Sequence, residues 1–168
     1  MQINRIMSHP PVTCPLDGTL EQPARLMWEF DCGIVPVVSD DGRLAGVVTD
    51  RDICMAAYFN GKSLCQIPVG TAMAHAVIAI HEDENVDHAA MLMRDNQVRR
   101  LPVIDDDGRP IGVVSLNDLT RFTLRVKRSG TDRELVQTMA AVREPRAHAE
   151  GDVAPVEQPV EVRPAVML

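Results

Sequence analysis

A tandem repeat is the strongest constraint on what this chain folds into. Residues 33–52 align with residues 99–118 without a gap, at a constant offset of 66 residues, and the match extends back to Met7 and Met73. A repeat of this kind is one supersecondary unit, which is too small to bury its hydrophobic faces alone. We therefore expect two related units that fold against each other.

Each copy has the pattern of one β-α-β-β-α unit. Apolar residues recur at helical spacing, and an Asp-Gly turn between two aliphatic runs is typical of a β-hairpin. The elements predicted for the first copy are strand 12–13, a helix capped by Thr19 with Gln22 in a capping box, strands 34–38 and 44–49, and a helix over 50–59. Those predicted for the second copy are strand 77–80, a helix capped by Asn85, strands 101–104 and 111–115, and a helix over 116–126.

The repeat predicts an α/β fold of the α+β type with pseudo-twofold symmetry. We expect the two sheets to pack together and close a common core, with one cleft beside each strand-to-helix turn. Beyond the repeat, Leu135, Met139 and Val142 share one face of a helix predicted over 131–142. After Pro145 the chain is rich in Pro, Val and Glu, which predicts a solvated tail.

Charge and composition narrow the function classes. The chain carries 17 Lys and Arg against 24 Asp and Glu, a formal net charge of −7, which argues against a nucleic-acid binder. No apolar run is long enough to span a membrane and no secretory signal is present, so we expect a cytoplasmic protein without membrane contact. Cys14, Cys32, Cys54 and Cys65 form no CxxC pair. Reduced thiols are the main interpretation, and a disulfide or a mixed Cys/His metal site stays open.

The strand-to-helix turns carry a resemblance to a known family. Segments 46–52 (GVVTDRD) and 112–118 (GVVSLND), which follow Val-Pro-Val-Val and Leu-Pro-Val-Ile strands, resemble the closing motif of CBS domains. The Met-Ser and Met-Ala openings match as well. The resemblance covers about residues 6–126 and is that of a small bacterial stand-alone protein with a tandem CBS pair, or Bateman module. It implies CBS domain 1 over 6–60, CBS domain 2 over 72–126, and a C-terminal helix and tail over 127–168.

The resemblance also implies a ligand. CBS pairs commonly bind AMP, ADP or ATP, and sometimes S-adenosylmethionine or a dinucleotide, and many sense energy or methyl-donor status for a partner. We therefore expect an adenine-nucleotide-binding regulatory module with no catalytic cofactor and no catalysis of its own. The resemblance further implies a homodimer, and it leaves room for an unidentified protein partner.

The Thr/Ser-x-x-Asp spacing at each strand-to-helix turn suits a nucleotide. Thr49 and Ser115 end a strand where a helix begins, and a hydroxyl beside free backbone N–H groups favours a phosphate. Asp52 and Asp118 follow one helical turn later, where a carboxylate can accept both hydroxyls of a ribose. The same spacing also makes a plain helix N-cap, so both interpretations stay open.

Further residues are assigned to the nucleotide sites by the resemblance or by charge. The resemblance implies an apolar slot for adenine made by Val12, Ile34, Val35, Pro36, Ile78, Leu101 and Pro102. The best candidates for contact with a di- or triphosphate are Arg51 and the pair Arg99 and Arg100, where the first copy has uncharged residues. Asn117, at the place of Arg51 in the second motif, is also assigned to the nucleotide site. We therefore predict two unequal sites, of which the one beside Arg99 and Arg100 favours anions more. A surface role for these arginines stays open.

Other function classes find less support in the sequence. The matching histidines, His9 and His75, are predicted to lie in loops beside the cleft entrance rather than to bind a metal. No activated nucleophile, phosphate-binding loop or metal-spaced cluster indicates an enzyme, and the acidic runs at 40–41 and 105–107 fit solvated hairpin turns. The alternatives to a nucleotide sensor are a dimeric interaction or stress protein with empty or degenerate sites, and a binder of S-adenosylmethionine or a dinucleotide.

Overall fold

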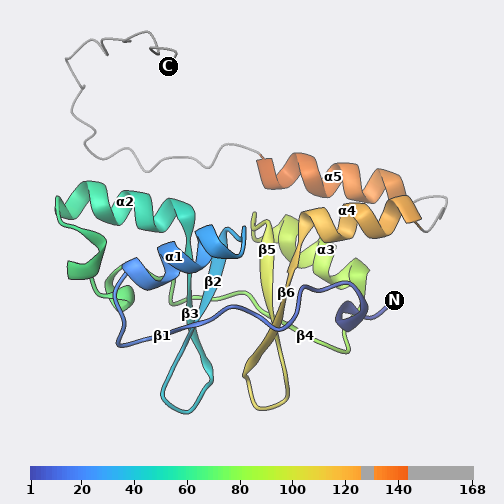
Figure 1. The fold of residues 1–168 in the computed structure, drawn as a ribbon. Helices are drawn as coiled ribbons and strands as arrows, with labels where there is room; N and C mark the ends of the chain where they lie inside the picture. The colour runs from blue at the N-terminus through green and yellow to red at the C-terminus, as the bar shows by residue number, and fades with distance from the viewer. Residues whose placement is uncertain (126–130, 144–168) are drawn as a thin grey trace, which may run out of the picture.

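The computed structural model describes residues 1–125 and 131–143, and it contains two β-α-β-β-α units side by side (Figure 1). The first unit comprises β1 (Cys14–Pro15), α1 (Glu21–Glu29), β2 (Ile34–Val38), β3 (Leu44–Thr49) and α2 (Asp50–Asn60). The second comprises β4 (Ile80–His81), α3 (Val86–Asp95), β5 (Arg100–Ile104), β6 (Pro110–Ser115) and α4 (Leu116–Arg125). The predicted α+β pair is confirmed. The tail after Pro145 and the predicted helix end at Val126 lie outside the described residues.

Each unit forms a three-stranded sheet with the same topology. β1 pairs in parallel with β2, and β2 pairs antiparallel with β3; β4, β5 and β6 repeat this arrangement. The hairpin turns pass through Gly42 and Gly108, whose φ values of 80° and 77° are free of strain only for glycine. The register places Arg100 opposite Ser115, so the start of β5 lies beside the turn from β6 into α4.

Side-chain caps begin some of the helices but not all of them. The Asn85 side chain accepts a hydrogen bond from the His88 N–H at 2.8 Å, as predicted. The predicted Thr19 cap is wrong. α1 follows Leu20 with no side-chain hydrogen bond, because this stretch pairs instead with a distant segment, and the Leu20 N–H donates to the Ile67 carbonyl at 2.9 Å.

The segments that lead into the two units are exchanged. The first eight residues, with a 3-10 turn at Ile3–Arg5, pack on the second unit, where Ser8 pairs with Val113. The linker between the units, with short turns at Leu64–Gln66 and Val69–Thr71, packs on the first unit. There Ala74 pairs with Val47. Each unit is therefore completed by chain that precedes the other.

The buried residues form two hydrophobic cores rather than one. Ile3 is fully buried in the core of the second unit, with Ile80 and Leu101 among its members. Val69 and Met73 belong to the core of the first unit. The prediction of a common core is therefore wrong, because each sheet already buries its apolar face against its own helices and an exchanged segment.

A fifth helix, α5 (Thr131–Arg143), covers the second unit. Leu135, Met139 and Val142 face that unit's core, as their spacing predicted, and α5 contacts both α3 and α4. The structure describes no corresponding helix over α1 and α2 (Figure 1). Among the described residues, no helix combines the length and hydropathy needed to cross a membrane.

Candidate ligand-binding site

A cleft of about 480 Å³ lies at the seam between the two units, and we call it the seam cleft. Its walls come from the loop before β1, the turn between α1 and β2, the start of β5 and the turn from β6 into α4, with one side chain from α5. The lining residues are 8–12, 30–34, 99–100, 113, 115–118, 121 and 139. Both units therefore contribute to the cleft. The N-terminal segment reaches it because Ser8 pairs with Val113 of β6.

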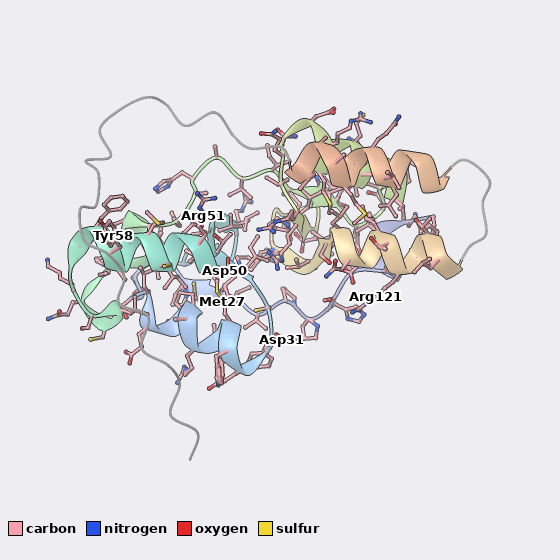
Figure 2. All side chains as sticks on the ribbon, turned by 90° about the horizontal axis from the view of Figure 1, so that it is seen from above. Met27, Asp31, Asp50, Arg51, Tyr58 and Arg121 are labelled. Atoms are coloured by element: carbon pink, nitrogen blue, oxygen red, sulfur yellow. The ribbon has the colours of Figure 1, made fainter. Side chains whose placement is uncertain are left out.

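The seam cleft unites part of the predicted nucleotide site, namely Val12, Ile34, Arg99, Arg100, Ser115, Asn117 and Asp118. Thr49, Arg51 and Asp52 lie at the other strand-to-helix turn, where α2 begins (Figure 2). The remaining predicted residues lie outside the lining of this cleft: Val35 and Leu101 are fully buried in the two cores, Pro36 and Pro102 are buried in the same strands, and Ile78 packs against the second core.

Asp118 is held at the cleft by the strand-to-helix turn itself. Its Oδ2 accepts hydrogen bonds from the Ser115 N–H at 2.9 Å and from the Ser115 hydroxyl at 2.6 Å, and the Asp118 N–H donates to Ser115 Oγ at 3.3 Å. This reciprocal arrangement is a capping box, which satisfies N–H groups at the start of α4. In the described part of the chain no hydrogen bond uses Asp118 Oδ1, so that oxygen is available to a ligand.

The first unit has the same arrangement at Thr49 and Asp52. Asp52 Oδ2 accepts from the Thr49 N–H at 2.9 Å and from the Thr49 hydroxyl at 2.7 Å, and the Asp52 N–H donates back at 3.3 Å. The interpretation as a plain N-cap is therefore correct for the hydrogen bonds at both turns. A cap occupies only one oxygen of each carboxylate, so capping and ligand binding are compatible.

The apolar wall of the seam cleft is formed in part by the turn after α1. Asp31 has a φ of 47°, in the left-handed region, and the Cys32 N–H donates to the Met27 carbonyl at 3.1 Å, which ends the helix. The chain then enters β2 at Ile34, which is 7% exposed, whereas the Phe30 ring on the same wall is 59% exposed. An apolar slot with one accessible aromatic ring suits a flat purine.

Three arginines line the same cleft, Arg99, Arg100 and Arg121. Arg100 packs so closely over Gly33 that a methyl group added to the glycine would stand 2.7 Å from Arg100 Nη2. Guanidinium groups bind carboxylates and phosphates through paired hydrogen bonds. The seam cleft is therefore equipped for an anion as well as for an apolar ring.

Two carboxylates, a thiol and a histidine complete the polar lining. Asp31 lies on the α1 side and Arg121 on the α4 side of the cleft (Figure 2). Burial raises the pKa of the Cys32 thiol, although backbone hydrogen bonds and the positive charge of Arg100 act in the opposite direction. His9 is exposed in the loop at the cleft, where the sequence predicted it. No group of potential metal ligands occurs among the residues that the structure describes.

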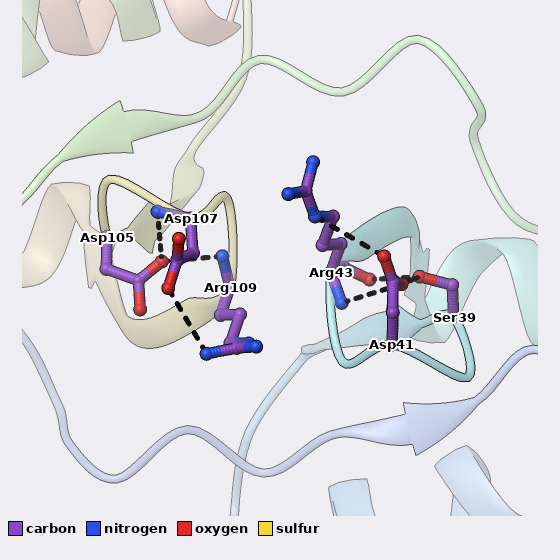
Figure 3. Close-up of polar contacts among 6 residues, drawn as sticks. All are labelled: Ser39, Asp41, Arg43, Asp105, Asp107 and Arg109. Atoms are coloured by element: carbon purple, nitrogen blue, oxygen red, sulfur yellow. Dashed lines mark hydrogen bonds and ion pairs between the residues drawn. The ribbon is translucent and has the colours of Figure 1, made fainter.

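The acidic hairpin runs close their own turns and do not reach the seam cleft. The Ser39 hydroxyl donates to Asp41 at 2.5 Å and Arg43 pairs with the same carboxylate, while Asp105 accepts from the Arg109 N–H at 2.8 Å (Figure 3). The Ser39 hydrogen bond, supported by the backbone N–H and the charge of Arg43, lowers the pKa of Asp41. The acidic runs lie in hairpin turns, as predicted, and these hydrogen bonds help to close the turns.

Sequence reasoning missed several wall residues. Phe30, Asp31 and Cys32 carry no motif, and Met139 reaches the cleft only because α5 docks on the second unit. Arg121 did carry a signal, because it follows Asp118 by one helical turn and therefore lies on the same face of α4.

Comparison with known proteins identifies the repeated unit. The family model for the CBS domain matches residues 3–58 and 69–125. The L-aspartate semialdehyde sulfurtransferase of Methanocaldococcus jannaschii is 33% identical over 120 residues, which cover 71% of this chain and 23% of that protein. The chain spans 20% to 47% of the length of this and four further curated relatives.

Solved structures of similar fold include two with adenosyl ligands. The CBS domain pair of protein MJ0100, in complex with 5′-methylthioadenosine and S-adenosyl-L-methionine, has a TM-score of 0.68 and 30% identity, and the match covers 76% of this chain and 98% of that one. CBSX2 in complex with AMP has a TM-score of 0.65 and 26% identity, with the same coverage of 76% and 98%. The similarity in each case extends over nearly the whole of the other chain.

Proposed function

This chain belongs to the CBS-domain family, and we propose that its domain pair is a regulatory module that binds an adenine nucleotide in the seam cleft. AMP, ADP or ATP is the proposed ligand, and S-adenosylmethionine or a dinucleotide is the alternative. Support comes from two similar structures, one in complex with AMP and the other with 5′-methylthioadenosine and S-adenosyl-L-methionine. A ligand of this kind regulates by binding one conformation of the protein more tightly than another.

The observation that carries the proposal is that no hydrogen bond among the described residues uses Asp118 Oδ1, in a cleft that also has an apolar wall and three arginines. Asp118 Oδ2 is used by the cap, which fixes the carboxylate, so Oδ1 can accept a ribose hydroxyl without disturbing α4. Val12, Ile34 and Phe30 offer an apolar wall to the base. A cap that orients a charged acceptor in advance lowers the cost of ordering it on binding.

The phosphate end of the ligand is assigned to the arginines at the start of β5. Arg99 and Arg100 lie beside the N-terminus of α4, where backbone N–H groups also favour negative charge. The corresponding residues of the first unit, Gly33 and Ile34, carry no charge. The prediction of two unequal sites is therefore retained, with Thr49, Asp52 and Arg51 at the second one.

A non-catalytic role and a homodimer are parts of the same proposal. The chain corresponds to less than a quarter of the sulfurtransferase that it resembles, so that enzyme's activity does not transfer to it. Trp28, Tyr58 and Phe59 on α1 and α2 are 89%, 72% and 75% exposed, and exposed aromatic groups of this size favour contact with a second chain. A cytoplasmic location stays a prediction from the sequence.

Isothermal titration with AMP tests the proposal on wild type, Asp118→Asn and Asp52→Asn. Asparagine preserves the shape of the cap but removes the charge that the ribose would meet. We expect Asp118→Asn to weaken the seam-cleft site about ten- to a hundredfold, the usual cost of a lost charge-assisted hydrogen bond. Asp52→Asn, the matched change in the first unit, leaves that site intact. The proposal fails if no AMP, ADP, ATP or S-adenosylmethionine binds at millimolar concentration to folded wild type.

A further inference from the structure

Arg121 is the arginine of the seam cleft that lies outside both the Ser-x-x-Asp motif and the start of β5. It lies on α4, three residues after Asp118, so the two side chains leave the same helix face about 4.5 Å apart along the axis. It lines the cleft opposite Asp31 and is exposed (Figure 2). Arg121 therefore follows, by one turn of α4, the residue assigned to the ribose.

In the part of the chain that the structure describes, the side chains of the cleft arginines are not engaged in ion pairs. Arg43, Arg94 and Arg109 lie outside the cleft, and each forms an ion pair with an aspartate. Within residues 1–125 and 131–143, by contrast, the side chains of Arg99, Arg100 and Arg121 form no ion pair or hydrogen bond with a protein group. Three unpaired cations in one hollow repel one another, and a multiply charged anion would relieve that repulsion.

The repeat shows that this third cation is specific to one half of the molecule. The offset of 66 residues places Met55 where the second unit has Arg121. Asp118 and Ser115, in contrast, keep their chemical counterparts Asp52 and Thr49. The ribose-binding groups are thus common to both units, whereas the additional charge on the helix face is not.

The carboxylates that face these cations leave a net positive charge. Asp31 and Asp118 are the acidic residues of the lining, against three arginines. Asp118 is committed to the cap and is the proposed ribose acceptor. Among the lining residues that the structure describes, Asp31 is therefore the acidic side chain that opposes an additional phosphate near Arg121.

We infer that Arg121 extends the anion site along α4, so that the seam cleft selects nucleoside di- and triphosphates over the monophosphate and over S-adenosylmethionine. The inference rests on the proposed function and adds to it the class of ligand. Arg121 contacts the second or third phosphate, and Asp31 moderates the affinity. S-adenosylmethionine has no phosphate, and its one carboxylate is offset by an ammonium and a sulfonium cation, so it gains less from three arginines than a di- or triphosphate does.

The test is a calorimetric comparison of AMP, ADP and ATP on wild type, Arg121→Met and Arg25→Met. Methionine is the residue at the equivalent position of the first unit, and Arg25 is an exposed arginine of α1 outside the cleft. We expect Arg121→Met to weaken ATP about ten- to a hundredfold while AMP changes less than threefold, so that the preference for ATP disappears. Arg25→Met leaves all three affinities unchanged.

A second variant tests the same site by gain of affinity. Asp31→Asn removes the opposing charge, and asparagine tolerates the positive φ at this position. It is expected to tighten ATP more than AMP, and added salt should reduce this gain. If AMP binds but neither variant changes the ratio of ATP to AMP affinity, the inference is overturned and the proposed function stands. If no nucleotide binds to wild type, both fall.

Discussion

At the level of single residues, the four cysteines show how burial changes the reactivity of identical side chains. The four cysteines are all unpaired, but Cys54 and Cys65 are exposed, Cys32 is half-buried in the cleft and Cys14 is buried. Burial raises the pKa of Cys14 to about 11 and also raises that of Cys32, where Arg100 partly opposes the effect. Because the thiolate is the reactive form, both thiols are expected to be less reactive than an ordinary cysteine.

Iodoacetamide labelling followed by mass spectrometry measures this order directly. At pH 7.5 we expect Cys54 and Cys65 to react first, Cys32 more slowly and Cys14 last. Because its pKa is raised, the Cys32 thiol becomes fully ionised only at a higher pH than an ordinary cysteine. The rate at which Cys32 is labelled should therefore continue to rise above pH 9. AMP in the cleft should slow the labelling of Cys32 alone. Labelling of Cys32 as fast as that of Cys54 would contradict the assigned pKa direction.

At the scale of elements, the repeat predicted most of the secondary structure because its signals are local. β2 and β3 lie where the alternating aliphatic runs and Asp-Gly turn placed them, and the Asn85 cap is also local. The start of α1 was wrong because Leu20 pairs with Ile67, a contact that no short window contains. For the same reason, the cap residues of the candidate site were found from sequence, whereas Phe30, Cys32 and Met139 were not.

Close packing between the elements explains why both copies of the repeat have a glycine at one matching position, Gly46 and Gly112. A methyl group on Gly46 would lie 2.5 Å from Met73 Sδ and 3.0 Å from the Ala74 carbonyl oxygen. On Gly112 it would lie 2.5 Å from Met7 Sδ and 3.1 Å from the Ser8 carbonyl oxygen. In both strands the obstacle is the exchanged segment, and its backbone is held by hydrogen bonds to the strand.

Alanine substitution at these glycines should therefore destabilise the protein. We expect Gly46→Ala and Gly112→Ala each to lower the free energy of unfolding by about 1–3 kcal/mol, the range for overpacking a well-filled site. Gly70→Ala is the control, because its added methyl group meets only Leu16 Cδ1 at 3.6 Å. Urea denaturation measures all three. Unfolding curves for Gly46→Ala that coincide with those of Gly70→Ala would show that the exchanged segment yields freely.

At the level of the whole molecule, the two exchanged segments connect the two separately packed cores, because each core contains residues from the segment that precedes the other unit. Ile3 and Val69 occupy equivalent positions in the repeat, and both are fully buried. Ile3 precedes the first unit but lies in the core of the second, whereas Val69 precedes the second unit but lies in the core of the first. The seam cleft lies where the exchanged chain passes from one unit to the other. Loss of either segment should therefore loosen the unit it covers and alter the cleft.

Hydrogen exchange on Ile3→Ala and Val69→Ala tests this crossed arrangement. Ile3→Ala should cost about 2–5 kcal/mol, as large cavities in cores do, and should speed exchange in β5 and β6. Val69→Ala removes a smaller side chain, should cost less, and should speed exchange in β2 and β3. An effect of Ile3→Ala confined to β2 and β3 would refute the crossed packing.

The proposed function requires Asp118 to hold the ribose of an adenine nucleotide in the seam cleft. A crystal structure of the protein grown with AMP would locate the nucleotide. We expect a ribose hydroxyl within about 2.6–3.2 Å of Asp118 Oδ1, the base against Val12 and Ile34, and the phosphate beside Arg99 and Arg100. AMP bound elsewhere, with Asp118 in contact with nothing but Ser115, would contradict it.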